Sequence, residues 1–384
     1  MTQSLHLNLF ILIVLLVIST GFPLNAQEDQ ANDLNFYGDF RFRVEHDWNS
    51  LKSDGTFRED RSRLRYRGRI GLNYTGIENV VVGARLRTGN PKKQQDPQLT
   101  LGDNFAEFNT LPLGLEMLFA QFQINSFTAW VGKNTFPFKK QNELFWSDNV
   151  FPEGISVSQS FRLNKSFLDG LDIHAGHFII RSDNRSFSAD SYFQGIQLVT
   201  YTNDKAISIY PSFYFFNEVP NIPDGNDTFT LDYTILHFGG QFRLGNSPLV
   251  ILGADFYRNL EDLGDIGPVA EPLRDQKTGV TAQLSFGELT QKGKWKGHVI
   301  YAYLERFAAV DFLAQNDWAR WDYSSQGSPD GRLTNMKGIE LMAGYALSEQ
   351  MDLQLKVYSV KQILPLGDTK ESGDRIRLDI NIRF

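Results

Sequence analysis

Arginine recurs at every second position in four short stretches of this 384-residue chain. Alternate residues of a β-strand project from the same face, so each stretch would place its guanidinium groups in one row. Arginine stays charged at physiological pH and offers a fork of N–H donors, which suits the binding or attraction of anions. The structural alternative is pairing with carboxylates such as Asp39, Glu45 and Asp379. The arginines are Arg41, Arg43, Arg63, Arg65, Arg67, Arg69, Arg85, Arg87, Arg375, Arg377 and Arg383.

Residues typical of catalysis are sparse. The chain has no cysteine, which excludes disulfides and thiolate chemistry. None of its histidines stands in a sequence motif with a nucleophile, and His174 and His177 fall on opposite faces of one expected strand. We therefore expect no catalytic residue, metal site or cofactor, and the net charge of −7 argues against a nucleic-acid partner. The six histidines are His6, His46, His174, His177, His237 and His298.

From Asn35 onward the sequence repeats a stretch of about ten alternating residues, a short turn, a second such stretch and a longer polar connection. In the second stretch, Leu64, Tyr66 and Ile70 share one face, and the arginines share the other. The short turns carry the Gly, Asn, Asp and Pro that tight turns require. The sixteen stretches are 35–46, 62–75, 80–89, 115–124, 127–133, 154–163, 171–180, 191–202, 206–216, 231–244, 249–258, 278–287, 295–304, 337–347, 351–360 and 374–384.

A soluble sandwich would alternate in the same way, but the number of strands, the alternating connection lengths and the charged polar faces favour a membrane barrel. The sequence thus predicts an all-β fold, a transmembrane antiparallel up-and-down β-barrel of about sixteen strands. It would span residues 35–384, with short periplasmic turns and long external loops. Sixteen strands leave room for an aqueous channel. Pro211 lies inside an expected strand, where we expect a β-bulge.

Neighbouring strands in such a barrel would join the arginine rows into one positive wall of the lumen, which would favour anions. The connection 134–153 is too apolar for a solvated loop, so it must pack against other residues. We expect it to fold into the lumen as a constriction; the alternatives are a cap at the rim and a subunit contact. Its polar and aromatic candidates near the constriction are Lys139, Lys140, Glu143, Trp146, Asp148 and Glu153.

Both ends of the chain are informative. An apolar run at 10–18 followed by Leu24-Asn25-Ala26 predicts a signal peptide, residues 1–26, cleaved after Ala26. An uncleaved anchor is the alternative, although the run is short for a spanning helix. Residues 27–34 would then be a short periplasmic lead-in. The last eleven residues, 374–384, alternate apolar and polar and end in Phe384. This ending resembles the C-terminal signature of bacterial outer-membrane barrels, which implies that the last strand closes the barrel and that the barrel-assembly machinery recognises Phe384.

Two internal blocks carry a more specific resemblance. Gly38-Asp-Phe-Arg-Phe-Arg-Val-Glu45 and the arginine-rich stretch after it resemble the opening of the family called "putative porins" of Gram-negative bacteria. Val131-Gly-Lys-Asn-Thr-Phe-Pro-Phe138, with Phe145-Trp-Ser-Asp148 and Phe151-Pro-Glu-Gly154, is similar to the central motif of that family. The chain departs from the motif at Ser147 and Phe151. Similarity to alginate-export barrels is weaker, although those barrels also have an arginine-rich lumen.

The resemblance implies a porin in the Gram-negative outer membrane that admits small hydrophilic solutes by passive diffusion. The arginine wall adds the expectation of anion preference. Two alternatives stay open: a specific transport barrel for an anionic polysaccharide, and a structural or adhesive barrel with a closed lumen. The expected partners are outer-membrane lipid and lipopolysaccharide, and the sequence leaves open whether the chain forms a homotrimer.

Overall fold

The computed structural model describes most of the chain after the N-terminal region. The expected signal peptide, 1–26, and most of the expected lead-in, 27–34, lie outside the described residues. The described residues are 33–95, 97–102, 109–163, 167–184, 190–202, 205–221, 229–264, 269–314, 317–318, 333–365 and 367–384.

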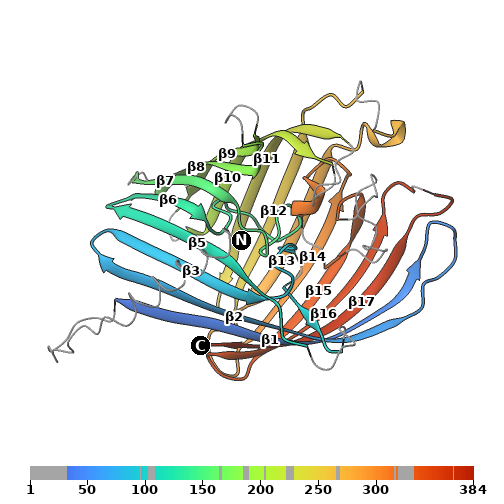
Figure 1. Cartoon of the computed structure of the whole chain (residues 1–384), viewed down its shortest axis with the longest axis horizontal. Coiled ribbons are helices and arrows are strands. Elements are labelled where there is room, and N and C mark those ends of the chain that lie inside the picture. Colours follow the sequence, from blue (N-terminus) through green and yellow to red (C-terminus); the bar gives the residue numbers. More distant parts are fainter. Residues whose placement is uncertain are drawn as a thin grey trace, which may run out of the picture. The chain divides into compact units, whose positions relative to one another are not determined.

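Antiparallel strands make up nearly all of the regular structure in this part of the chain, and they follow one another in sequence order (Figure 1). The strands are β1 (Leu34–Leu51), β2 (Arg61–Ile77), β3 (Val80–Thr88), β4 (Leu99–Thr100), β5 (Leu113–Ile124), β6 (Phe127–Lys133), β7 (Glu153–Arg162), β8 (Gly170–Arg181), β9 (Ser191–Tyr201), β10 (Ile207–Pro220), β11 (Thr230–Asn246), β12 (Leu249–Asn259), β13 (Thr278–Gly287), β14 (Trp295–Leu304), β15 (Met336–Ala346), β16 (Met351–Gln362) and β17 (Ser372–Arg383). Two single-turn 3₁₀ helices, Glu271–Leu273 and Asp311–Leu313, lie in connections.

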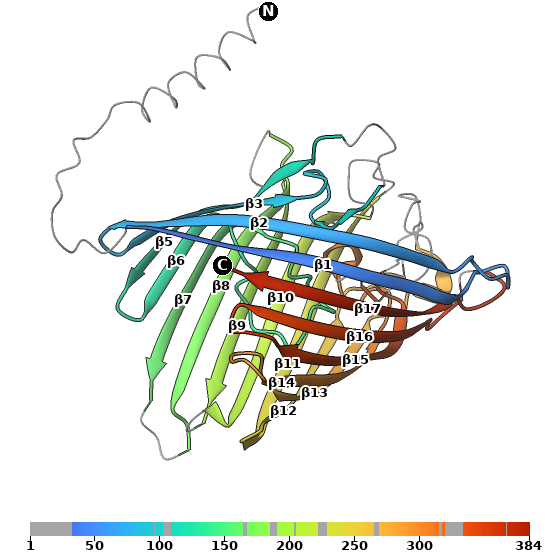
Figure 2. The ribbon, with the colours of Figure 1, turned by 90° about the horizontal axis from the view of Figure 1, so that it is seen from below.

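The sheet closes on itself between its first and last strands. β1 pairs with β2 along one edge and with β17 along the other, so β17 lies beside β1 (Figure 2). The closing register places Phe42 opposite Ile380 and Arg43 opposite Asp379. The backbone of Phe384 exchanges two hydrogen bonds with Gly38, of 2.7 and 3.0 Å. Closure removes the free edges that an open sheet would expose.

The predicted all-β, sixteen-stranded antiparallel barrel is confirmed. Each of the sixteen predicted stretches corresponds to one long strand, and the two-residue β4 is an addition inside the connection between β3 and β5. Short and long connections alternate along the described chain as predicted. The long connections are 52–60, 89–112, 134–152, 182–190, 221–229, 260–277, 305–335 and 363–371.

The two faces of the sheet differ sharply in composition. Alternate residues such as Phe40, Leu64 and Phe213 are exposed on the outer face, where Ile70 keeps 61% of its surface accessible. Their neighbours point inward and are largely buried, among them Arg43 and Tyr214. A continuous exposed apolar face is what a barrel presents to lipid. Among the described residues, no helix is long and apolar enough to cross a membrane.

The prediction of a β-bulge at Pro211 is wrong. The register of β10 against β11 runs without a shift from Ile207 to Phe216, and the bulge in this pair lies further on, between Phe216 and Val219. On the β9 side, pairing is interrupted from Tyr210 to Pro211 and resumes in the same register. The missing N–H of proline therefore interrupts the ladder locally without inserting a residue.

Candidate functional site

The predicted arginines gather on the inner face of four adjacent strands, β17, β1, β2 and β3. Register places Arg41 opposite Arg67, and Arg43 opposite Arg65, across β1 and β2. Arg69 lies opposite Arg87 across β2 and β3. Like charges directly opposite one another are destabilising unless other groups compensate. Carboxylates from these strands, from the neighbouring β5 and β16 and from one long connection supply that compensation.

Most guanidinium groups in this wall form ion pairs. Arg43 Nε donates to Asp379 Oδ1 at 2.7 Å, and Arg375 Nε donates to Asp47 Oδ1 at 2.5 Å. Arg63 pairs with Glu45, and Arg67 pairs with Asp39. The structural alternative, pairing with inner carboxylates, therefore holds for these side chains. The pairs join strands that are adjacent in the barrel but in some cases more than 300 residues apart in sequence.

Glu116 on β5 is a shared partner that the sequence did not single out. Its Oε2 accepts from Arg85 Nε at 2.7 Å, and its Oε1 lies 3.1 Å from Arg69 Nη2 and 3.7 Å from Arg87 Nε. A β-bulge between β3 and β5 makes both Glu116 and Met117 buried, because the extra residue reverses the alternation. In the sequence, the only sign that Glu116 points inward is its position as the single carboxylate among the apolar residues of 113–118.

A second carboxylate reaches the wall from a long connection. Asp317, in the connection 305–335, pairs with Arg377 and lies 3.6 Å from Arg43. Its backbone carbonyl accepts from Arg375 Nη1 at 3.0 Å. Burial opposes the ionisation of Asp317, but Arg377 and Arg43 outweigh burial and hold the pKa of its carboxyl well below the usual range. This connection therefore docks on the external half of the arginine wall.

Three further predicted arginines contact other groups among the described residues. Arg41 Nε donates to Asn381 Oδ1 at 2.6 Å and lies 3.8 Å from Asp379. Arg65 donates to the Gln98 carbonyl at 3.3 Å. Arg383, near the end of the closing strand, pairs with Asp352 on β16 at 2.7 Å.

Among the contacts between described residues, the arginines of this network outnumber the carboxylates. The arginines are Arg41, Arg43, Arg61, Arg63, Arg65, Arg67, Arg69, Arg85, Arg87, Arg375, Arg377 and Arg383, and the carboxylates are Asp39, Glu45, Asp47, Glu116, Asp317, Asp352 and Asp379.

Residues 134–152, the inner segment, lie against the inner face of the barrel. The segment leaves β6 and returns to β7, yet it contacts strands far from both. The Gln141 backbone N–H donates to Asp255 on β12 at 3.0 Å, and Asn142 donates to Thr281 on β13 at 3.1 Å. Asn149 accepts from Arg69 on β2 at 2.8 Å. Contacts with β2 and with β12 and β13 place the segment across the interior (Figure 1).

Aromatic packing holds the inner segment in place. Trp146 stacks on Phe136 with ring centroids 4.4 Å apart, and Phe145 stacks on Tyr257 of β12 at 4.6 Å. Phe138 packs edge-on against Tyr214 of β10 at 5.3 Å. These rings belong to a buried cluster that also takes in parts of the connections 260–277 and 305–314. The high apolar content that distinguished this segment in the sequence is thus buried against the strand wall.

Two glycines on the wall make room for the inner segment. A Cβ on Gly195 of β9 would overlap the Phe138 ring, and a Cβ on Gly253 of β12 would overlap the side-chain amide of Gln141. Neither glycine was predicted to have a role. A glycine on the inward face of a strand is a general signal of close approach by another chain segment.

A buried chain of hydrogen bonds lies beneath Lys139 and Gln141. Ser212 Oγ lies 2.9 Å from His237 Nδ1, and His237 Nε2 lies 3.1 Å from Asp255 Oδ1. These residue types match those of a hydrolytic triad, although the three residues are far apart in the sequence and form no motif there. All three side chains are buried, Gln197 also donates to Ser212 Oγ, and Asp255 accepts from the inner segment. The chain of bonds therefore satisfies buried polar groups and anchors the segment.

The predicted constriction residues take different positions. Lys139 Nζ lies over the Tyr210 ring, and Lys140 Nζ pairs with Asp148 and donates to the Trp146 carbonyl at 2.8 Å. Burial lowers the pKa of Lys139. For Glu143, burial raises the pKa and the neighbouring Asp148 carboxylate raises it further.

Glu153 does not belong to the inner segment. It is the first residue of β7, in phase with the exposed Ile155 and Val157, and it pairs with Lys133 of β6. The alternation of the strand therefore directs Glu153 to the outer face, away from the expected constriction.

Within the described ranges, no group of three or more His, Asp and Glu side chains is arranged to hold a metal ion. The geometry offers an arginine-lined wall on one side of the interior and an apolar segment that packs on the other side and reaches across to Arg69.

Comparison with protein families and curated proteins gives one match. A family model described as "Putative porin" matches residues 50–233 and 228–384. The matched ranges include the inner segment and the arginines of β2, β3 and β17. None of the curated proteins matches the chain.

Several solved porin structures share the fold. A structure titled "Salmonella typhi OmpF complex with Daunomycin" is similar over 92% of this chain and 99% of its own, with 12% identity and a TM-score of 0.54. A high-pH structure of Pseudomonas putida OprB is similar over 92% and 94%, with 13% identity and a TM-score of 0.55. A mutant of the Rh. blastica porin is similar over 91% and 100%, with 12% identity and a TM-score of 0.51. At these identities the likeness shows the fold.

Proposed function

This chain belongs to the family described as "Putative porin", a family of non-enzymatic outer-membrane channels, and on that basis we propose that it admits small hydrophilic solutes by passive diffusion with a preference for anions. The observation that supports the anion preference is the concentration of arginines on the wall formed by β17, β1, β2 and β3, where they outnumber the described carboxylates. Ion pairing reduces the field of this wall, and the proposal requires that a net positive field remains. A residual positive field in a narrow, low-dielectric passage raises the local anion concentration.

The inner segment supports this proposal by its position. Because its aromatic side chains pack against β9–β12, the segment occupies the side of the interior opposite most of the arginines. The end of the segment reaches back to the wall, where Asn149 accepts from Arg69 and Phe151 lies beneath Arg85, so solutes would pass beside the arginines that the segment leaves uncovered. We propose that Lys139, Lys140 and the Lys140–Asp148 pair lie along that path, with Trp146 and Glu143 holding the shape of the segment.

The test is the reversal potential of single channels of the purified protein in a salt gradient. Replacing Arg65, Arg67 and Arg85 by Ser should shift selectivity towards cations. Surface charges are screened within about 8–10 Å at physiological salt, so the shift should be largest in dilute salt and shrink as salt rises. The matched control neutralises three exposed cations outside the arginine network, Arg162, Lys292 and Lys294. An unchanged reversal potential in the arginine variant would remove anion preference and leave a general porin.

One observation favours a second candidate, a transporter of an anionic polysaccharide. Arg63, Arg65, Arg67 and Arg69 form an uninterrupted row on β2. At about 3.3 Å per residue this row is roughly 20 Å long, which could contact several charged sugars at once. Oligouronates should then block the conductance at concentrations where neutral sugars of equal size do not. A purified, folded barrel without any conductance would instead support the closed-lumen alternative.

A further inference from the structure

The outer face of β14–β17 changes character over three successive rows near the long connections. The row nearest the connections is polar and basic, the next is mixed, and the third is apolar. Cross-strand register defines the rows, which are Tyr303, Lys337, Lys361 and Ser372; then Tyr301, Ile339, Ser359 and Asp374; then Val299, Leu341, Val357 and Ile376. Tyrosine at such a boundary is typical of the membrane–water interface. The basic row therefore lies where the headgroups of the outer leaflet would meet the barrel.

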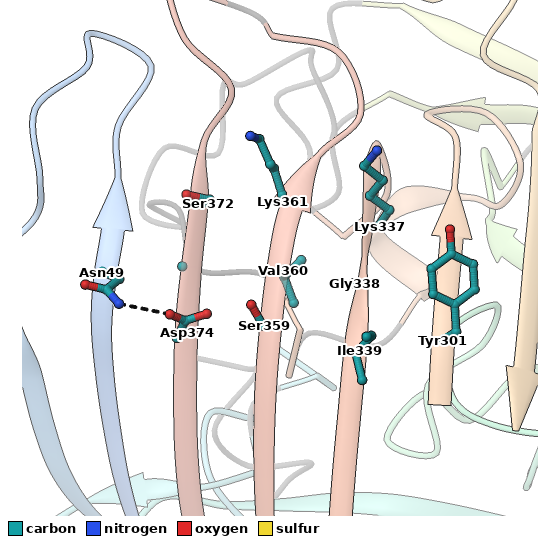
Figure 3. A pocket seen from close by; sticks show the side chains of 11 residues that line it. Asn49, Tyr301, Lys337, Gly338, Ile339, Ser359, Val360, Lys361, Ser372 and Asp374 are labelled. Atoms are coloured by element: carbon teal, nitrogen blue, oxygen red, sulfur yellow. Dashed lines mark hydrogen bonds between the residues drawn. The ribbon is translucent and has the colours of Figure 1, made fainter. Parts of the chain in front are cut away.

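A depression of about 410 Å³ opens between these rows (Figure 3). It exists because small residues interrupt the outer face: Ser359 lies between the larger Ile339 and Asp374. Tyr301 borders the depression on one side, and Asn49 borders it on the other. The hollow is thus built from side chains on four strands and on the external end of β1.

Two lysines dominate the charge at its external edge. Lys337 and Lys361 are exposed and lie directly opposite each other in the ladder between β15 and β16. Like charges in that position repel unless an anion neutralises them. Within the described part of the chain, neither ammonium group forms an ion pair with a carboxylate. Figure 3 shows both side chains extending in the same direction, beyond the hollow.

The single carboxylate in the depression is already engaged. Asp374 Oδ2 accepts from Asn49 Nδ2 at 3.1 Å and belongs to the row below the lysines. The neutral Asn49 amide does not cancel the charge of Asp374, but no ion pair joins Asp374 to either lysine in the described part of the chain. The hydroxyl groups of Ser359 and Ser372 add donors suited to phosphate oxygens.

We propose that this depression binds the phosphorylated headgroup of an outer-leaflet glycolipid. Lys337 and Lys361 contact the phosphate, the serines contact the sugar or the phosphate, and the acyl chains lie over the apolar row that contains Leu341 and Val357. The inference rests on the outer-membrane location that the family implies and does not depend on the solute or on ion preference. Two lysines facing one phosphate combine charge attraction with hydrogen bonding.

The test measures the binding of a bis-phosphorylated lipid A to the folded, full-length mature protein in detergent, by native mass spectrometry. Each lysine near an anionic headgroup contributes about fivefold to affinity, so Lys337→Gln with Lys361→Gln should weaken binding about 30-fold. Enzymatically dephosphorylated lipid should bind the unmodified protein as weakly as the intact lipid binds the double variant. The control, Lys292→Gln with Lys294→Gln, makes the same charge change in the turn at the opposite end of β14 and should bind normally.

Heat-modifiable migration on gels verifies that each variant is folded, because the mutated side chains are exposed. Equal affinity of the double variant and the unmodified protein would overturn the proposal, as would equal affinity for the dephosphorylated lipid. Displacement of the lipid by inorganic phosphate at similar concentration would also overturn it, since the site would then be one for free anions. Conductance recorded on the same double variant should be unchanged, which separates this proposal from the proposed channel function.

Discussion

At the scale of single residues, the arginine wall depends on carboxylates that are almost fully enclosed. Glu116 is 3% exposed and contacts three arginines from two strands. A buried carboxylate in this position stabilises the barrel by relieving repulsion between guanidinium groups, and it also lowers the net positive charge. If the proposed anion preference holds, the same residue links stability to selectivity.

Glu116→Gln should separate these two effects. Removing one partner from a buried ionic cluster costs about 3–5 kcal/mol, so the free energy of unfolding should fall by that order. The added positive charge should move the reversal potential towards anions, opposite to the arginine variants. Urea unfolding in lipid vesicles and single-channel recording measure the two quantities. Glu153→Gln, on the outer face, is the control with the same chemical change, and equal behaviour of the two variants would refute the role of Glu116.

The raised pKa of Glu143 predicts that the barrel becomes less stable as the pH rises. Burial and Asp148 raise its pKa in the folded barrel, so the protonated form is favoured there. Glu143 stabilises the folded barrel at pH values below its pKa in the unfolded chain. This stabilisation is lost as the pH rises through the pKa that Glu143 has in the folded barrel. Glu143→Gln cannot ionise, so it should raise the thermal midpoint of the barrel at pH 8 and leave it unchanged at pH 3.5. A variant less stable than the unmodified protein at pH 8 would contradict this assignment.

At the scale of elements, the inner segment fits the wall only where side chains are missing. Gly195 and Gly253 give Phe138 and Gln141 the space that they occupy. Because these glycines lie on the inner face of β9 and β12, larger residues there would displace the segment without changing the strands themselves.

Gly195→Leu with Gly253→Leu should loosen the inner segment and raise single-channel conductance. Protease cleavage within 139–149 reports whether the segment has moved, since a displaced segment is more accessible. Gly240→Leu provides the control, because a Cβ on Gly240 of β11 would make only an ordinary contact, 3.8 Å from the Ser208 carbonyl oxygen, and would lie on the opposite face. If the segment becomes cleavable while conductance stays constant, it does not narrow the passage.

At the scale of the whole barrel, closure depends on the contact between the two ends of the sheet. The closing pair β1–β17 runs from Asp39 opposite Arg383 to Leu51 opposite Ser372, and the Phe384 backbone bonds to Gly38 at its end. The exposed ring of Phe384 remains accessible on the outer side. This accessibility is compatible with recognition by the assembly machinery.

Deleting Phe384 should therefore reduce the amount of folded barrel in the outer membrane. The deletion removes two backbone hydrogen bonds at the closing seam together with the terminal aromatic ring. Phe384→Tyr keeps both the backbone and an aromatic end, so it should assemble normally. Heat-modifiable barrel, quantified in outer-membrane fractions, is the measurement, and unchanged amounts after deletion would remove the terminal residue from the assembly step.

The sequence by itself determined the strands, their two faces and the closing strand, because alternation with a period of two is a local property. The rows of arginine on β1, β2, β3 and β17 followed directly from that period. The apolar composition of 134–153 also predicted that this segment is buried. It did not predict which residues the segment packs against.

Tertiary structure decided everything that depends on contacts between distant residues. It determined that Asp379 and Asp47 neutralise arginines on other strands, that a bulge turns Glu116 inward, and that Asp317 reaches the wall from a connection. It also brought Lys337 and Lys361 together across two strands. The physical reason is that cross-strand register and the packing of connections are set by partners that no local pattern encodes, so they exist only once the barrel has closed.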